Sequence, residues 1–176
     1  MYTKCLPNFI LVCIFTMNRA AQRRILLIVG NLAEIDGKMV CFFDGHCKLC
    51  NGAVRWLIRR DRRDCLRFAA LESAIGEELM ARHGISALHS KSGPTTILVV
   101  RGFGGPDERV LARSEAVLAL LGQLPQPWPT IATVLSLIPR PVRDLGYRLI
   151  ARWRYRIWGR LEICTIPSAD ERMRYL

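Results

Sequence analysis

The chain has 176 residues, of which 51% are hydrophobic and 23% charged, a composition typical of a globular protein and not of a disordered chain. Its formal net charge of +11 is large for this length and favours contact with an anionic surface or an acidic partner, although a basic surface without such a ligand explains it as well. The sequence contains neither a recognised nucleic-acid-binding motif, so no specific nucleic acid is expected as a partner, nor an apolar run of the roughly 20 residues that a membrane span needs.

The seven cysteines are an odd number, and their spacings do not repeat as a disulfide framework. This favours a reducing, cytoplasmic compartment in which one pair is functional and the others are ordinary buried thiols. We interpret Cys41 and Cys65 as packing residues, and Cys164 as either a packing residue or a third redox partner.

Residues 1–38 contain apolar patches without clear helix caps, and we expect a poorly structured N-terminal leader there. The apolar run over residues 9–17 has the length of a signal-peptide core, but most of the nearby positive charges follow the run instead of preceding it. A start codon placed too far upstream is the favoured interpretation, because the first clear strand begins at Met39.

From Met39 the hydrophobic pattern predicts a strand, a tight turn and an amphipathic helix. Residues 39–43 form the short continuous apolar run that is typical of a strand buried on both faces. Asp44 and Gly45 end this run, and a helix is predicted over residues 47–60. The predicted apolar face of this helix consists of Cys50, Ala53, Val54 and Leu57, and its basic face of Lys48, Arg55 and Arg59.

The next segment again has the pattern of a strand followed by a helix. Residues 66–71 predict a second strand, and Ser73 is expected to cap a helix that ends near His83. Because strands that alternate with helices favour parallel pairing, the first two strands should be parallel.

Two further strands and a helix complete the predicted domain. Residues 95–101 and 108–112 predict strands that are joined by a glycine-rich turn and paired as a hairpin. Ser114 is then expected to cap a helix that ends near Leu124. The order β-α-β-α-β-β-α is that of the thioredoxin fold, so we expect an α/β, thioredoxin-like redox domain over residues 39–124, with a central mixed sheet of about four strands flanked by helices.

Residues 125–176 predict a helical C-terminal extension packed on this domain. Prolines surround a short predicted helix at 131–138, and a longer helix is predicted up to Gly159. The longer helix is amphipathic, so it either docks on the domain with its arginine heads in water or lies on an anionic membrane surface. Its apolar stripe is Val142, Leu145, Leu149, Trp153 and Ile157, and its basic stripe is Arg148, Arg152 and Arg156.

The motif Cys47-Lys-Leu-Cys50 is the candidate catalytic site. Two cysteines three residues apart at the start of a helix can form a disulfide without movement of the backbone. The helix N-terminus supplies unpaired N–H groups and partial positive charge, which favour a thiolate over a thiol. Since Cys47 lies at the helix mouth and Cys50 shares the apolar face with Val54, we expect Cys47 to be the exposed nucleophile and Cys50 the buried resolving thiol.

Other interpretations of the cysteine pair stay open. Zinc sites use the same spacing, but a structural zinc site needs four ligands, and the remaining histidines and cysteines do not form a second pair in the sequence. We therefore expect neither a metal nor another cofactor. Two inert buried thiols are the second alternative.

Asp44 is a third candidate catalytic residue, through proton movement or electrostatic tuning of the pair, and three other residues are candidates for tuning or substrate contact. Asp44 is either a turn former at the strand-to-helix junction or a group that moves protons for the resolving thiol. His46 and Lys48 can add positive charge beside the thiolate. Pro94 precedes the third strand, where a thioredoxin fold places a cis-proline against the active-site loop, and both its cis and trans states stay open.

The residues around the motif resemble a known family. Residues 42–52 are similar to the signature of the DCC family of predicted thiol–disulfide oxidoreductases, which is named for an Asp-x-x-Cys-x-x-Cys pattern that Asp44, Cys47 and Cys50 match one for one. The resemblance implies a thioredoxin-like fold and protein-disulfide reductase activity. It leaves residues 1–38 uncovered and continues through residues 55–61, 113–116 and 154–159 to Cys164 and Pro167.

We therefore expect an enzyme, a thiol–disulfide oxidoreductase of the protein-disulfide reductase type, that acts on a disulfide-containing protein or a small thiol. The alternative is a membrane-surface binding or scaffold protein that acts through the basic C-terminal helix, with the cysteine pair incidental or regulatory. A cytoplasmic location with peripheral contact to an anionic membrane is compatible with both.

Overall fold

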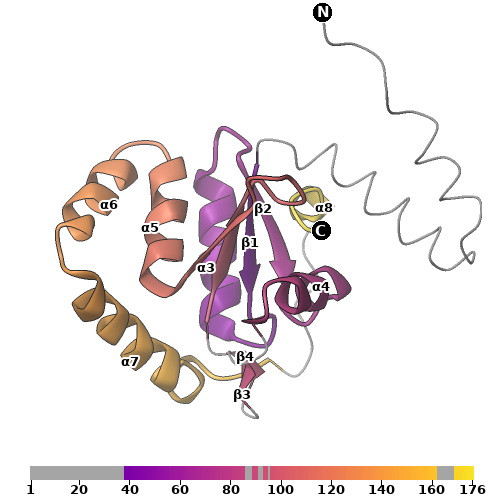
Figure 1. Ribbon diagram of the computed structural model, residues 1–176. Coiled ribbons are helices and arrows are strands. Elements are labelled where there is room, and N and C mark those ends of the chain that lie inside the picture. The colour runs from indigo at the N-terminus through magenta and orange to yellow at the C-terminus, as the bar shows by residue number, and fades with distance from the viewer. Residues whose placement is uncertain (1–37, 86–88, 91–92, 95, 162–168) are drawn as a thin grey trace, which may run out of the picture. The chain divides into compact units, whose positions relative to one another are not determined.

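The centre of the molecule is a four-stranded mixed sheet with the strand order β2-β1-β5-β6 (Figure 1). The computed structural model describes residues 38–85, 89–90, 93–94, 96–161 and 169–176, so the predicted N-terminal leader, apart from Lys38, lies outside the described residues. The four strands are β1 (Met39–Phe43), β2 (Leu66–Ala70), β5 (Leu98–Arg101) and β6 (Arg109–Ala112).

Two of the three strand pairings have the predicted directions, namely the parallel pair of β1 and β2 and the hairpin of β5 and β6, whereas the antiparallel pairing of β1 with β5 was not predicted. β1 is parallel to β2 and antiparallel to β5, and β5 is antiparallel to β6. Within this register Cys41 lies opposite Phe68 on one side and Val99 on the other. The α/β, thioredoxin-like fold and the predicted hairpin are confirmed.

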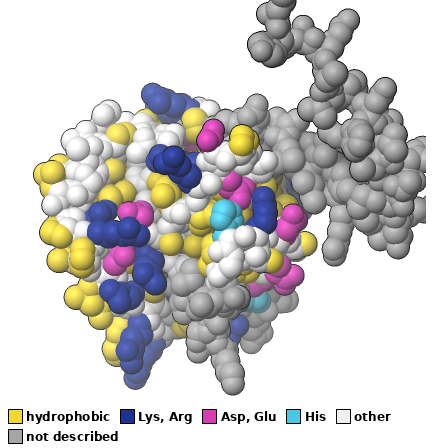
Figure 2. All heavy atoms as spheres, in the orientation of Figure 1, with side chains coloured by type: hydrophobic (Ala, Val, Ile, Leu, Met, Phe, Trp, Pro, Cys, Tyr) yellow, Lys and Arg dark blue, Asp and Glu magenta, His cyan; other side chains and the backbone are white. Residues whose placement is uncertain are grey.

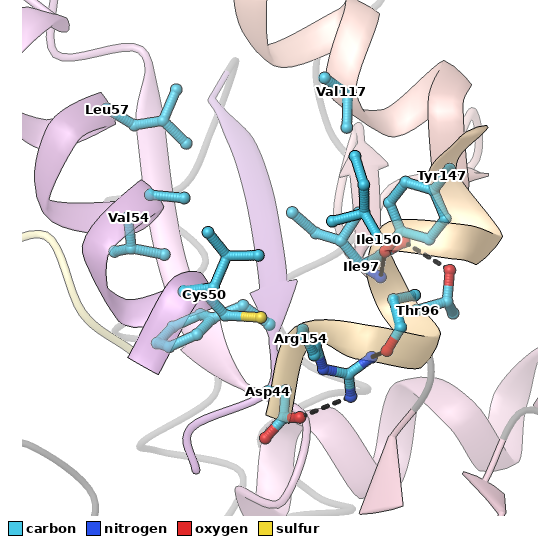
Figure 3. Close-up of a pocket in the computed structure, with 14 residues that line it drawn as sticks. Asp44, Cys50, Val54, Leu57, Thr96, Ile97, Val117, Tyr147, Ile150 and Arg154 are labelled. Atoms are coloured by element: carbon cyan, nitrogen blue, oxygen red, sulfur yellow. Dashed lines mark hydrogen bonds and ion pairs between the residues drawn. The ribbon is translucent and has the colours of Figure 1, made fainter. Parts of the chain in front are cut away.

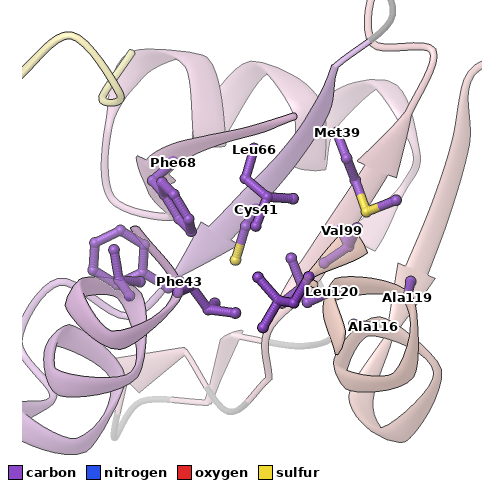
Figure 4. Packing of buried hydrophobic residues seen from close by; sticks show 12 residues of the cluster. Met39, Cys41, Phe43, Leu66, Phe68, Val99, Ala116, Ala119 and Leu120 are labelled. Atoms are coloured by element: carbon purple, nitrogen blue, oxygen red, sulfur yellow. The ribbon is translucent and has the colours of Figure 1, made fainter. Parts of the chain in front are cut away.

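The hydrophobic core lies between the sheet and two helices, α3 (Lys48–Arg60) and α5 (Arg113–Gln123) (Figure 4). Alternate residues of β1, Met39, Cys41 and Phe43, point into this core because side chains alternate between the two faces of a strand. The intervening residues of β1 are also buried, since α4 (Ala74–Arg82) packs against β2 on the other side of the sheet from α3 (Figure 1). A strand buried on both faces explains why residues 39–43 form a continuous apolar run.

The expected cap at Ser114 is wrong. The N-cap of α5 is Ala112, because β6 passes directly into the helix through Arg113, which has a φ of 55°. The Ser114 hydroxyl instead donates a hydrogen bond of 2.5 Å to Oδ1 of Asp144. The serine therefore joins α5 to a later helix.

The segment before the third predicted strand also differs from the sequence prediction. It contains a small antiparallel hairpin of β3 (His89–Ser90) and β4 (Gly93–Pro94), and β5 begins only at Leu98. Strands of two residues have no periodicity from which they could be predicted.

The C-terminal extension contains α6 (Trp128–Ser136) and α7 (Arg140–Trp158), and both helices pack against α5, while α7 also packs against α3. Two polar residues of the α7 helix point inward: Asp144 is 8% exposed and Arg154 is 5% exposed. Its predicted apolar stripe points outward, with Leu149 53% exposed and Ile157 63% exposed. The side of α7 that packs against α3 and α5 is therefore not the apolar stripe.

A short helix, α8 (Ala169–Arg172), precedes a segment that pairs with the outer edge of β2. The Phe68 N–H donates to the Arg174 carbonyl at 2.8 Å, and the Leu176 N–H donates to the Phe68 carbonyl at 2.9 Å. Between these bonds, the Tyr175 ring packs against Phe43 and Phe68. Within the described ranges, none of the helices combines the length and the hydropathy that a membrane span requires.

Candidate active site

The two cysteines of the motif lie at the N-terminus of α3, as predicted. Cys47 has an extended backbone and is the N-cap, and its sulfur accepts a hydrogen bond of 3.3 Å from the backbone N–H of Cys50. In the preceding turn the Asp44 carbonyl accepts from the Cys47 N–H at 3.2 Å, and Oδ1 of Asp44 accepts from the His46 N–H at 3.0 Å. Asp44 thus has the turn-forming role that was one of its two interpretations.

A buried asparagine that the sequence reasoning did not single out holds the same turn. The Asn51 side-chain amide donates to the carbonyls of Gly45 at 2.8 Å and Cys47 at 2.9 Å. Its position one helical turn after Cys47 was the available signal, since a side chain there reaches back over the helix start. Asn51 therefore fixes the backbone from which the Cys47 sulfur projects.

The surroundings of Cys47 favour its ionised form. A hydrogen bond from the Cys50 thiol, together with the Cys50 N–H and the positive charge of Arg154, lowers the pKa of Cys47 to about 6, although burial and the Asp44 carboxylate act in the opposite direction. Because a thiol with a pKa near 6 is mostly ionised at neutral pH, the thiolate is the dominant form of Cys47.

The same interactions have the opposite effect on the second cysteine. The Cys50 thiol is the donor toward Cys47, and this hydrogen bond, burial and the charge of the Cys47 thiolate all raise the pKa of Cys50. Both sulfurs are free in the structure. The pair is therefore a thiolate beside a neutral thiol, the arrangement of a reduced dithiol.

The charge beside the dithiol comes from α7 and not from the neighbours that the sequence suggested. Nη2 of Arg154 lies 2.7 Å from Oδ2 of Asp44, and both side chains are buried. The Tyr155 hydroxyl donates to the same carboxylate oxygen, and the Arg154 guanidinium lies over the Tyr155 ring at 4.6 Å. Arg154 and Tyr155 were missed as site residues because Asp44 lies about 110 residues earlier, and the family resemblance over residues 154–159 was the signal that could have pointed to them.

The exposure predicted for the two cysteines is reversed. Cys47 is 0% exposed, whereas Cys50 is only partly buried. The chain after α7 lies against the Cys47 backbone: Arg160 forms a backbone bridge with Cys47, and the Leu161 N–H donates to the His46 carbonyl at 2.8 Å. We call Gly159–Leu161 the covering segment.

His46 and Lys48 lie beside this covering segment. Nδ1 of His46 lies 3.3 Å from the Leu161 carbonyl oxygen, and the Lys48 side chain lies next to Gly159. Both residues therefore contact the covering segment.

The remaining candidates lie apart from the described site or outside it. Cys41 is buried in the core, and Cys65 lies at the entrance to β2. Pro94 belongs to β4, but its side chain and the neighbouring Thr95 lie outside the described residues, as does Cys164. Among the residues with described positions, no group of three or more histidine, cysteine or acidic side chains could hold a metal ion.

Cys50 faces a cavity of about 260 Å³ between α3, α5 and α7 (Figure 3). Most of the wall is apolar, and Asp44 and Arg154 lie together at one end. The Tyr147 hydroxyl lies in the wall and accepts the Ile97 N–H at 2.8 Å, while burial raises the pKa of Tyr147. The apolar lining comes from Phe43, Leu49, Ala53, Val54, Leu57, Ile97, Val117, Ile150 and Ala151.

A known protein family matches the part of the chain that contains this site. The family model described as "DCC1-like thiol-disulfide oxidoreductase" matches residues 41–160. YuxK of Bacillus subtilis (strain 168), an uncharacterised protein, is 32% identical over 137 residues, which cover 78% of this chain and 93% of YuxK. A chloroplastic DCC family protein of Arabidopsis thaliana is 33% identical over 133 residues, which cover 76% of this chain and 72% of that protein. No solved structure matches the chain. The matched region contains the turn, both cysteines and the α7 residues that reach Asp44, and the chain belongs to the DCC1-like thiol–disulfide oxidoreductase family.

Proposed function

We propose that this protein reduces disulfides by thiol–disulfide exchange, with Cys47 as the attacking sulfur and Cys50 as the resolving one. The observation that carries the proposal is the unequal ionisation of the pair: the pKa of Cys47 is lowered to about 6, while that of Cys50 is raised. Since the thiolate is the nucleophile, ionisation assigns the first attack to Cys47 even though Cys50 is the more exposed sulfur.

The reaction has two exchange steps. In the first, the Cys47 thiolate attacks one sulfur of the substrate disulfide, which gives a mixed disulfide and releases the other substrate sulfur as a thiolate. In the second, Cys50 loses its proton and attacks the Cys47 sulfur, which releases the second substrate thiolate and leaves a Cys47–Cys50 disulfide. Two electrons pass to the substrate, and a dithiol reductant returns them to the enzyme for the next cycle.

Asp44 is the proposed proton acceptor for the second step. Its carboxylate lines the same cavity as Cys50, and it carries negative charge that opposes ionisation of both sulfurs. Once the Cys47 sulfur is part of the mixed disulfide, it no longer carries a negative charge, so Cys50 ionises more easily at that stage. The Arg154 guanidinium keeps the carboxylate aimed into the site.

Access to Cys47 is part of the proposal. Because the Cys47 side chain is fully covered, a disulfide reaches its sulfur only after the covering segment has moved away from the His46–Cys47 backbone. The segment is joined there by the Leu161–His46 hydrogen bond and by backbone contact with Arg160, a small number of bonds compared with those in the sheet.

Trapping of the mixed disulfide tests the function and the roles together. The full chain and its Cys47→Ser and Cys50→Ser variants are incubated with a small aromatic disulfide, in the presence of a dithiol reductant to measure turnover and in its absence to trap the adduct, with Cys65→Ser as the matched control. We expect turnover by the wild type and by the control, no turnover by either site variant, and a stable adduct on Cys47 in the Cys50→Ser protein by mass spectrometry.

Two results would contradict this account. Absence of turnover by the wild type would remove the proposed function. Continued turnover by Cys47→Ser, with the adduct on Cys50, would assign the first attack to the exposed sulfur instead.

A further inference from the structure

The α7 helix does not dock on the domain in the way that an ordinary amphipathic helix does. A helix on the surface of a globular domain normally places its apolar stripe on the core and its charged residues in water. Here Asp144 and Arg154 are buried, while the five residues of the apolar stripe are exposed. We call this exposed stripe the outer face of α7; it consists of Val142, Leu145, Leu149, Trp153 and Ile157.

Apolar exposure continues from the outer face of α7 onto α6. Leu137, in the turn between the two helices, is 79% exposed, and Val134 of α6 is also largely exposed. In Figure 2, hydrophobic side chains gather along the margin of the molecule that α6 and α7 form in Figure 1. Contiguous apolar surface of this kind marks a site of protein or membrane contact.

The charges that border this surface are almost all positive. Arg148, Arg152 and Arg156 are exposed, and their four-residue spacing places them along one side of the outer face of α7. The one acidic residue of α6 and α7 is Asp144, which is buried on the opposite side. An anionic occupant therefore meets no exposed carboxylate on either helix.

The aromatic residues of α7 have the amphipathic placement that suits a lipid interface. Trp153 lies within the outer face and Trp158 at the end of the helix, both partly exposed, and the Arg156 guanidinium lies 5.5 Å from the centre of the Trp153 ring. Tryptophan is favoured at the headgroup level of a bilayer, where its ring is in apolar surroundings and its N–H in water.

We infer that α6 and α7 dock on an anionic lipid surface, with the outer face of α7 in the boundary between headgroups and acyl chains and the arginines on lipid phosphates. Lipid fits better than a protein partner or a second copy, because the face is a long apolar stripe bordered by arginines with no exposed acidic group to pair with them. This inference does not depend on the proposed redox function. It concerns the side of α7 that lies opposite Arg154.

Vesicle binding tests the inference. The full chain is floated with vesicles of phosphatidylcholine alone and with vesicles that contain phosphatidylglycerol, at low and at high salt. Two variants remove separate parts of the surface: Arg152→Glu with Arg156→Glu removes positive charge, and Leu145→Gln with Leu149→Gln removes apolar area. Arg62→Glu with Arg63→Glu, in the exposed turn after α3, gives the same change of net charge elsewhere.

We expect the wild type and the Arg62/Arg63 control to bind anionic vesicles, with a shift of tryptophan emission to shorter wavelength and weaker binding at high salt. The Arg152/Arg156 variant should bind at least about tenfold more weakly. The Leu145/Leu149 variant should lose the emission shift at any salt. No binding by the wild type, or equal loss in the Arg62/Arg63 control, would overturn the inference. So would a self-association that needs Leu145 and Leu149 without any vesicle binding, because a second copy would then cover this face.

Discussion

Arg154 on α7 and Asp44 at the end of β1 form a buried ion pair with 2.7 Å between Nη2 and Oδ2. This pair joins the C-terminal extension to the active-site turn, and Tyr155 adds a hydrogen bond to the same carboxylate. The site therefore requires α7 to be in place, and the stability of the two is linked.

The first prediction concerns this pair. Arg154→Gln should lower the free energy of unfolding by about 3–5 kcal/mol, because it leaves the Asp44 carboxylate buried without its cation. The double variant Asp44→Asn, Arg154→Gln should lose clearly less than the sum of the two single variants in urea unfolding. Arg140→Gln breaks an exposed ion pair with Glu115 and is the control, with an expected change of about 0–1 kcal/mol. Additive single changes would show that the two buried side chains do not interact.

Ionisation of Cys47 gives the second prediction. The ultraviolet absorbance of the thiolate, taken as the difference between the reduced wild type and Cys47→Ala, should appear with a midpoint near pH 6. Cys50→Ala should move this midpoint upward, since the hydrogen bond from the Cys50 thiol is the largest influence that lowers the pKa of Cys47. A midpoint at the ordinary cysteine value in the wild type would contradict the assigned charge state.

The same lowered pKa has a consequence for stability. A group with a lower pKa in the folded protein stabilises the fold fully above its unfolded pKa, and this contribution is lost as the pH falls through the folded value. The reduced wild type should therefore lose stability relative to Cys47→Ala between about pH 8.5 and pH 6, the window between the ordinary cysteine pKa and that of Cys47.

The third prediction tests the covering segment at Gly159. Gly159 ends α7 with φ 84° and ψ 172°, a conformation that is open essentially to glycine alone. Gly159→Ala should destabilise the fold by about 1–3 kcal/mol and increase the rate at which iodoacetamide alkylates Cys47. Gly146→Ala, within α7 and with open space at its Cβ position, is the control and should stabilise the helix slightly. An unchanged alkylation rate in Gly159→Ala would show that the covering segment does not control access to Cys47.

The fourth prediction concerns the apolar cavity beside Cys50. Ala151→Leu places a larger side chain in its wall and should lower kcat/KM for a disulfide with aromatic substituents by about tenfold, while the pKa of Cys47 stays unchanged. Ile150→Leu keeps the side-chain volume and serves as the control. Equal kcat/KM in the two variants would mean that the substrate does not enter this cavity.

The sequence predicted the parts of the fold that local pattern determines. The continuous apolar run at residues 39–43, the cysteine pair at the start of α3 and the hairpin of β5 and β6 all follow from periodicity and turn residues. It could not predict the segment that lies against Cys47, because Arg160 and Leu161 follow more than 100 residues later.

The sequence pattern also could not predict which side of α7 faces the domain. The apolar stripe of an amphipathic helix predicts a face that avoids water, but the pattern does not say whether a core or an external surface provides that protection. Here Arg154 and Asp144 have buried partners in Asp44 and Ser114, and these long-range polar contacts determine which side of the helix faces the domain.

The pairing of residues 174–176 with β2 determines how this sheet meets other chains. An unpaired edge strand offers free N–H and C=O groups to which a strand of another molecule can add, a common start of aggregation. Both hydrogen-bonding groups of Phe68 on that edge are already engaged, by Arg174 and Leu176. Detachment of this short segment, for instance by proteolytic trimming, would open a template for intermolecular β-sheet growth beside β1, in which all five residues are buried.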